Sequence, residues 1–134
     1  MNIELLDLKI NGDERGSLIA LESLKNIPFA IKRVYYLFDT KDGVQRGFHA
    51  HRVLNQLLVC VSGSCSVLID NGMEKEVVNL TENNVGLVIG PMLWREMFNF
   101  SSNCVLMVLA DDYYNESDYI RNYDEFIKES RLLK

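Results

Sequence analysis

The apolar residues of this chain fall into short runs that are separated by turn-forming residues. The runs are rich in Val, Ile, Leu, Tyr and Phe, which favour strands, and they recur at nearly regular spacing. This pattern predicts strands over residues 3–10, 15–22, 31–39, 46–52, 54–62, 64–70, 73–80, 85–89, 93–100 and 103–111.

Turn signals mark the boundaries of several predicted strands. An Asn-Gly-Asp sequence at 11–13 separates the first two strands. Gly63 lies between two apolar runs, as in a tight hairpin. Asn71 and Gly72 predict a two-residue hairpin, because both central positions of that turn favour positive φ.

The pattern changes from Ser117 onward. Tyr119, Tyr123, Phe126 and Ile127 keep a spacing of three or four residues, which indicates one C-terminal helix or two short turns. Many short strands followed by one short helix predict an all-β fold, either a β-barrel or a jelly roll.

Length and charge narrow the possible functions. The chain has 134 residues, so we predict a single domain over residues 1–134. Its apolar content of 48% and charged content of 25% are typical of soluble globular proteins. The net charge of −5 argues against nucleic-acid binding. A phosphorylated ligand therefore requires a local cluster of arginines or lysines.

The cysteines and the N-terminus bear on localisation. Cys60, Cys65 and Cys104 are odd in number and form no C-x-x-C motif, so we interpret them as buried thiols in a reducing compartment. The first ten residues contain acidic side chains and do not resemble a signal peptide. No apolar run approaches the roughly 20 residues of a membrane span. We therefore expect a cytoplasmic protein without membrane partners.

The two histidines of the chain are the strongest candidate for chemistry. His49 and His51 are two residues apart on a predicted strand, so both imidazoles project from one face. Phe48, Ala50 and Arg52 project from the other face. Two histidines paired in this way beside arginines favour a functional site over a purely structural one.

The segment around this pair resembles the first cupin motif, G-x5-H-x-H-x4-E-x6-G. Gly43, His49, His51 and Gly63 match its spacing, but Gln56 stands where the motif has a carboxylate metal ligand. This resemblance implies a cupin-type jelly roll, and the neutral Gln56 weakens the case for a metal.

The second cupin motif normally supplies a third histidine after a P-x-G sequence. The matching region here runs from Pro91 to Glu96 and contains no histidine, and Arg95 adds a positive charge beside Glu96. Most catalytic metal sites need three or four protein ligands. We therefore predict that no metal is bound.

Proton transfer is the remaining role for the pair. Imidazole titrates near neutrality, so it can accept and donate protons at physiological pH. Two imidazoles on one face suit a keto–hydroxy rearrangement through an enediol, which needs no redox cofactor. The chain also lacks the G-x-G-x-x-G and G-x4-G-K-[ST] fingerprints of nucleotide-binding loops. We expect no cofactor.

Nearly the whole chain resembles the sugar-nucleotide 3,4-ketoisomerases that act on dTDP-4-keto-6-deoxy-D-glucose. The resemblance implies a metal-independent cupin and a homodimer with exchanged N-terminal strands. It also implies a 3-keto product that an aminotransferase converts to a 3-amino-3,6-dideoxyhexose for surface polysaccharide. The matching segments are DERGSL (13–18), IPFAIKRVYYLFDT (27–40), RGFHAHR (46–52), QLLVCVSGSC (56–65), GPMLWREMFNFS (90–101) and VLADDYYNESDYIRNYDEF (108–126).

The resemblance implies a catalytic role for both histidines. His49 is expected to move the carbon-bound proton and His51 to shuttle protons between the two oxygens, although the reverse assignment stays open. Arg46 suits bidentate contact with a diphosphate. Arg33 and Tyr35 share one face of their predicted strand, and both are expected to face the substrate.

Two further positions bear on the configuration at carbon 4 of the product. Arg95 matches a family position that varies between His and Arg, and Arg favours the gluco product. Ser17 departs from the larger residue associated with gluco-forming enzymes. The configuration therefore stays open from the sequence alone.

Two other functions remain open from the sequence. A cofactor-free 3,5-epimerase acting on a similar substrate has the same barrel type. A non-catalytic sugar-binding cupin would bind the ligand without turnover. The nucleotide rests on the family resemblance alone.

Overall fold

A computed structural model describes residues 1–133. Short strands dominate it, as the hydrophobic pattern predicts. They are β1 (Glu4–Asp7), β2 (Asn11–Asp13), β3 (Gly16–Leu18), β4 (Arg33–Leu37), β5 (Arg46–His51), β6 (Gln56–Ser62), β7 (Cys65–Asp70), β8 (Lys75–Leu80), β9 (Val85–Ile89), β10 (Trp94–Phe98), β11 (Val105–Ala110) and β12 (Tyr119–Ile120). A 3-10 turn, η1 (Glu116–Asp118), precedes β12, and the helix α1 (Tyr123–Leu132) follows it.

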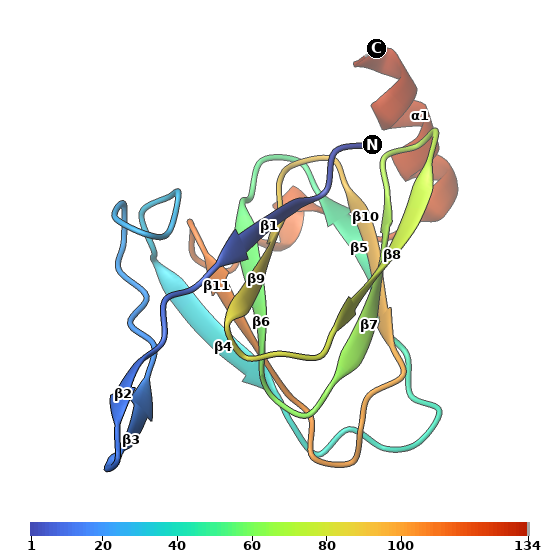
Figure 1. Ribbon diagram of the computed structural model, residues 1–134. Coiled ribbons are helices and arrows are strands. Elements are labelled where there is room, and N and C mark those ends of the chain that lie inside the picture. Colours follow the sequence, from blue (N-terminus) through green and yellow to red (C-terminus); the bar gives the residue numbers. More distant parts are fainter. Residues whose placement is uncertain (134) are drawn as a thin grey trace.

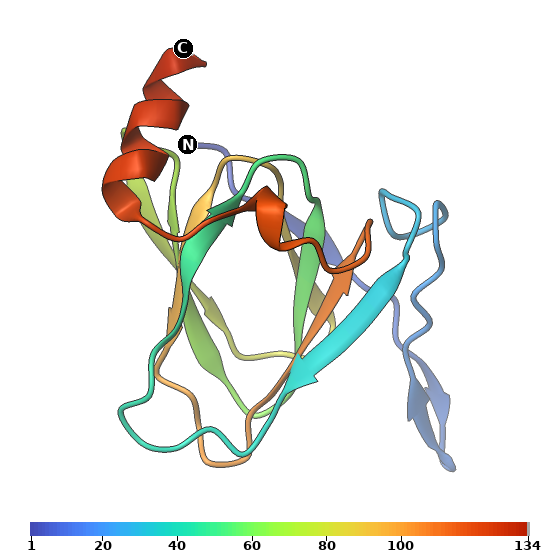
Figure 2. The ribbon, with the colours of Figure 1, turned by 180° about the vertical axis from the view of Figure 1, so that it is seen from behind.

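Two five-stranded antiparallel sheets form the walls of a barrel (Figure 1). One sheet has the order β1-β9-β6-β11-β4, and the other has the order β12-β5-β10-β7-β8. Strands β2 and β3 form a separate hairpin that projects from the barrel beside β4 (Figures 1 and 2). The predicted jelly-roll barrel with a short C-terminal helix is confirmed.

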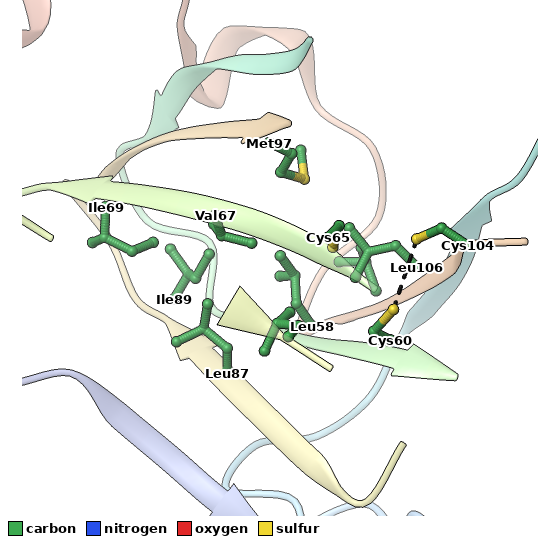
Figure 3. Packing of buried hydrophobic residues seen from close by; sticks show 12 residues of the cluster. Leu58, Cys60, Cys65, Val67, Ile69, Leu87, Ile89, Met97, Cys104 and Leu106 are labelled. Carbon is green, nitrogen blue, oxygen red and sulfur yellow. Dashed lines mark hydrogen bonds between the residues drawn. The ribbon is translucent and has the colours of Figure 1, made fainter. Parts of the chain in front are cut away.

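The barrel interior is filled by inward side chains from both sheets. Leu58 and Leu106 on one sheet pack with Val67 and Ile69 on the other, and all four are buried (Figure 3). Each such side chain contributes roughly 1.5–3 kcal/mol through removal from water. This apolar layer joins the two sheets and separates the two ends of the barrel.

The structure tests four local predictions. The Asn-Gly hairpin is confirmed, because β7 and β8 pair directly on either side of it. The predicted hairpin at Gly63 is wrong, since β6 and β7 belong to opposite sheets and the turn crosses between them. Residues 11–13 do not break the chain but form β2, which pairs with β3. The predicted strand 15–22 is shorter in the structure and covers Gly16–Leu18. The β2–β3 hairpin lies outside both barrel sheets, so β3 pairs only with the short strand β2.

The C-terminal helix packs on the outside of β5 and β10. The Asn122 side chain caps it by accepting a hydrogen bond from the Glu125 backbone N–H at 2.9 Å. Phe126 is fully buried against Trp94, with ring centroids 5.8 Å apart, and both belong to one apolar cluster with Ala50. Trp94 is therefore a packing residue. In residues 1–133, no helix combines the length and apolar character needed to cross a membrane.

Strand β5 contains a β-bulge immediately before the first histidine. Arg95 of β10 pairs with His49, whereas the next residue, Glu96, pairs with Gly47, so Phe48 is the extra residue. Gly47 has φ of 90° and Phe48 has φ of 59°. A bulge re-aims the side chains that follow it. Here it sets the direction in which His49 enters the barrel.

We expect Gly47→Ala to destabilise the protein by about 2–4 kcal/mol and to lower activity. Its φ of 90° is strained for alanine, and an added Cβ would lie 2.9 Å from the Arg95 carbonyl oxygen. Urea unfolding measures the loss. Gly43→Ala is the matched control, because Gly43 has φ of 75° but no atom within 4 Å of the added Cβ. Equal losses in the two variants would contradict a specific role for the bulge.

Candidate active site

The two histidines lie together on the inner face of β5. Their ring centroids are 4.9 Å apart and the rings are nearly perpendicular, at 87°. His51 is 1% exposed and His49 is half-buried. The predicted shared face is confirmed, since Ala50 packs outward under α1 and Arg52 binds Glu129 at the surface.

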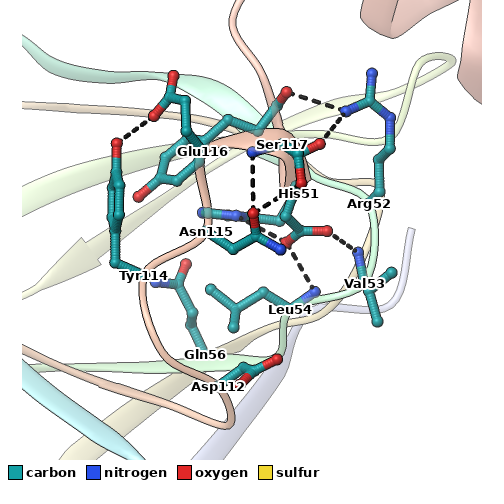
Figure 4. Close-up of polar contacts among 12 residues, drawn as sticks. His51, Arg52, Val53, Leu54, Gln56, Asp112, Tyr114, Asn115, Glu116 and Ser117 are labelled. Carbon is teal, nitrogen blue, oxygen red and sulfur yellow. Dashed lines mark hydrogen bonds and ion pairs between the residues drawn. The ribbon is translucent and has the colours of Figure 1, made fainter.

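Asp118 orients His51 from the turn before β12. One Asp118 carboxylate oxygen lies 3.2 Å from His51 Nδ1. Figure 4 shows the preceding residues Asn115 and Ser117 beside His51. The same carboxylate accepts hydrogen bonds from the backbone N–H groups of Val53, at 2.9 Å, and Leu54, at 3.3 Å. A carboxylate partner requires a proton on Nδ1, so a neutral His51 carries its lone pair on Nε2. That nitrogen is therefore available as a base.

Buried polar atoms without a partner concentrate at this site. Of the four such side-chain atoms found in residues 1–133, three are Arg33 Nε, His49 Nδ1 and His51 Nε2. An unsatisfied buried polar group costs about 1–3 kcal/mol. Such groups gathered in one place favour a polar ligand that pairs with them.

Burial and positive charge hold both imidazoles neutral. Burial lowers the pKa of His49 to about 4, and the charge of Arg95 adds to the shift. The pKa of His51 is also well below its ordinary value, because of burial, Arg95 and His49. The Asp118 carboxylate opposes this shift, since a negative charge favours the imidazolium. Both histidines can therefore accept a proton at neutral pH.

Tyr119 of β12 covers the histidine pair. Its ring centroid lies 4.9 Å from that of His49 and 4.3 Å from that of His51. The Arg121 guanidinium lies 4.2 Å from the Tyr119 ring and is held by Glu116 at 2.7 Å. These contacts place an aromatic ring and a positive charge at the entrance to the site.

Two hollows meet at Tyr119 and Arg33. One has a volume of about 330 Å³ and reaches His49, and the other has a volume of about 240 Å³ and reaches His51. The larger hollow is also lined by Tyr35, Leu37, Arg46, Gly47, Met97, Tyr114 and Arg121. Its three arginines form the local cationic cluster that a phosphorylated ligand requires.

A polar chain lies deeper in the barrel. Gln56 donates to the Tyr35 hydroxyl at 3.1 Å, and its carbonyl oxygen accepts from Arg95 Nη1 at 2.5 Å. Arg95 also donates to the Leu93 carbonyl oxygen at 3.1 Å. Gln56 occupies the carboxylate position of the cupin motif, and here it binds a guanidinium. A neutral amide and a buried cation make a poor environment for a metal cation.

The structure brings most of the predicted residues together. Arg33, Tyr35 and Arg46 line the hollow that reaches His49. Arg95 is buried behind the histidines, where Gln56 and Leu93 take its hydrogen bonds, and it lines neither hollow. Ser17 lies on β3 of the projecting hairpin, and Figure 1 shows this hairpin apart from β5, the strand that carries both histidines.

Three further residues shape the site and were not predicted from the sequence. Asp118, Tyr119 and Arg121 come from the segment after β11. The spacing of Tyr119, Tyr123, Phe126 and Ile127 predicted a helix or two turns from Ser117 onward, but Tyr119 lies on β12 and the helix begins at Tyr123. The three residues reach the site because β12 pairs with β5, with Tyr119 opposite His51.

We expect stability to fall as the pH drops from 7 to 5. The unfolded chain takes up histidine protons below about pH 6.5, whereas the folded pKa of His49 is about 4. The slope per histidine is therefore up to about 1.4 kcal/mol per pH unit in this window. Urea unfolding measures it, and the double variant His49→Asn/His51→Asn should give a flatter profile. A wild-type profile that is flat or rises on acidification would contradict this.

Comparisons with known proteins agree with this geometry. A model of the family described as FdtA, WxcM-like, C-terminal, matches residues 1–131. The TDP-4-oxo-6-deoxy-alpha-D-glucose-3,4-oxoisomerase of Aneurinibacillus thermoaerophilus is 56% identical over 128 residues, which cover 96% of this chain and 92% of that protein.

Two solved structures are also similar. A mutant of the 3,4-ketoisomerase QdtA from Thermoanaerobacterium thermosaccharolyticum, in complex with TDP-4-keto-6-deoxyglucose, has a TM-score of 0.95 at 44% identity, covering 98% of this chain and 95% of that one. The TDP-quinovose 3,4-ketoisomerase WlaRB from Campylobacter jejuni has a TM-score of 0.90 at 50% identity, covering 95% and 98%. The resemblance to sugar-nucleotide 3,4-ketoisomerases is confirmed, and the chain belongs to the FdtA family.

Proposed function

We propose that this protein isomerises a TDP-linked 4-keto-6-deoxyglucose to its 3-keto form. The observation that carries the proposal is the pair of neutral imidazoles on β5, each with an unpartnered ring nitrogen beside a hollow lined by arginines. The relatives named for this activity support the substrate. The 3-keto product suits a following transamination for surface polysaccharide.

The reaction needs two kinds of proton movement. His49 removes the proton from carbon 3, which produces an enediol, and then returns a proton to carbon 4. His51 takes the proton of the carbon-3 hydroxyl and delivers one to the oxygen on carbon 4. Carbon 3 is oxidised and carbon 4 is reduced within one molecule, so the electrons balance without a cofactor.

The arginines suit the nucleotide part of the substrate. Arg33, Arg46 and Arg121 line one hollow, and a guanidinium binds phosphate oxygens in a bidentate manner. Tyr35 and Tyr119 provide the walls beside the sugar. Binding a diphosphate also supplies an anionic partner for Arg33, whose Nε is buried without one.

We also propose the gluco configuration at carbon 4. The WlaRB relative, at 50% identity, is named for TDP-quinovose, which is the 6-deoxyglucose form. Arg95 lies across from His49 in the β5–β10 ladder and lowers the pKa of both histidines. Through the histidines, Arg95 influences the face from which carbon 4 receives its proton. Ser17 contributes to this choice only if it comes from a partner subunit.

We also propose that the protein forms a homodimer. Val34, Tyr36 and Phe38 are more than half exposed on the outer face at β4, which is the edge strand of its sheet. An unpaired edge with apolar side chains favours association with a second copy. Because β1 pairs with β9 of its own chain, the projecting β2–β3 hairpin is the part free to be exchanged.

Incubation with TDP-4-keto-6-deoxyglucose in deuterated water, followed by proton NMR, tests the reaction. We expect a 3-keto product with the gluco configuration and with solvent deuterium at carbon 4, because carbon 3 of the product is a carbonyl and carries no hydrogen. His49→Asn and His51→Asn should each lower kcat by roughly 10²–10⁴-fold with the fold intact, and chelators should have no effect. Label at carbon 5 would indicate an epimerase, and binding without turnover would indicate a sugar-binding protein.

Asp118→Asn should lower kcat by about 100-fold or more while KM changes little, because the tautomer of His51 is no longer fixed. Nitrogen NMR of the imidazoles reports the tautomer directly, and we expect Nδ1 of His51 to lose its full protonation. Asp124→Asn is the control, since Asp124 is exposed on α1. An unchanged tautomer in Asp118→Asn would contradict this positioning role.

Light scattering after size-exclusion chromatography tests the dimer. We expect a dimer for the unmodified protein and a monomer for Val34→Asp/Tyr36→Asp, because two buried charges disrupt an apolar interface. Met73→Asp is the control, since Met73 is exposed at the β7–β8 turn on the opposite sheet. A monomeric unmodified protein would refute the proposal.

A further inference from the structure

Three thiols converge at the end of the barrel opposite the histidines. Cys60 lies on β6, Cys65 begins β7 and Cys104 immediately precedes β11 (Figure 3). Their sulfur atoms all lie within 4.8 Å of one another, and Cys60 Sγ is 3.7 Å from Cys104 Sγ. All three are buried, and no disulfide links them. These three residues are called the thiol cluster below.

The thiol cluster is separate from the proposed active site. Gln56 and Cys60 lie on the same strand and both face the barrel interior, four residues or about 13 Å apart. The apolar layer around Leu58 and Leu106 fills the space between them. The proposed reaction therefore gives no reason for three sulfurs at this end.

Packing alone accounts for burial of the thiols but not for their geometry. A buried cysteine usually behaves as a small apolar side chain. Three sulfurs around one ion at about 2.3 Å lie about 4.0 Å from one another, close to the observed spacing. The cluster thus has the dimensions of a trigonal metal site.

The number of sulfurs favours a three-coordinate ion. Structural zinc sites almost always take four protein ligands in a tetrahedron, whereas this cluster offers three sulfurs among the described residues. Metals bind the thiolate rather than the thiol, so each coordinating cysteine releases its proton to solvent when the ion binds.

We propose that Cys60, Cys65 and Cys104 form a binding site for a soft monovalent metal ion such as Cu(I). Soft sulfur ligands select such ions over harder ones. All three sulfurs bind as thiolates, their protons pass to solvent, and no electron transfer occurs. Because β6 and β11 belong to one sheet and β7 to the other, the bound ion links the two walls of the barrel.

Anaerobic titration of the reduced full-length protein with Cu(I), in the presence of a competing chelator, tests the site. We expect one ion per chain, a sulfur-to-copper absorption band in the ultraviolet and a higher thermal unfolding midpoint. A ligand that binds the folded state and not the unfolded state raises this midpoint. A lower midpoint would show that Cu(I) prefers the unfolded chain and would overturn the proposal.

Cys60→Ala, Cys65→Ala and Cys104→Ala test the three ligands separately. Each substitution should weaken Cu(I) binding by on the order of 100-fold or more, because losing a direct ligand weakens binding more than losing a residue that only orients a ligand. Leu106→Val is the matched control, because it alters the packing beside the cluster but keeps all three sulfurs. Retained affinity in all three alanine variants, or equal loss in Leu106→Val, would overturn the proposal. Unfolding of each metal-free variant identifies any that fails to fold, and the remaining variants then decide.

Discussion

Strand β5 is held by hydrogen bonds on both edges, between β10 and β12, and the proposed catalytic site depends on this arrangement. The β10 edge contains the bulge that directs His49, and the β12 edge brings Asp118 and Tyr119 over His51. On its outer face β5 is covered by α1 through Ala50 and Phe126. Two imidazoles can be buried with free ring nitrogens only because the backbone that carries them is fixed from three directions.

The buried positive charge of Arg95 explains the electrostatics of this end of the barrel. A buried guanidinium is costly unless its donors are satisfied, and Gln56 and the Leu93 carbonyl oxygen satisfy them. The same charge disfavours protonation of both histidines. An amide in place of a carboxylate at position 56 thus goes together with a buried guanidinium and with two histidines that are held neutral.

Much of the fold followed from the sequence because alternating apolar positions define strands, and the shared face of His49 and His51 followed from the same period of two. The error at Gly63 arose because a glycine turn looks the same whether it joins neighbouring strands or crosses between sheets. The short strand β2 was missed because it pairs only with β3, outside the barrel.

The candidate site was predictable where residues lie on barrel strands, as with Arg33, Tyr35 and Arg46. Asp118, Tyr119 and Arg121 were not, because the two residues of β12 are too few to show a periodic pattern. Their positions depend on a long-range pairing that no local signal specifies. The burial of Arg95 was likewise unpredictable, since it requires Gln56 as a partner 39 residues away.

The position of β12 near the end of the chain has a consequence for protein synthesis. Ribosomes release a chain from its N-terminus, so β1 to β11 emerge before Asp118, Tyr119 and α1. A nascent chain can form most of both walls while His51 still lacks its carboxylate partner and Ala50 still lacks its cover. The proposed site is therefore complete only after the last segment has been made, and a chain that ends before Asp118 contains most of both walls but lacks the carboxylate that orients His51.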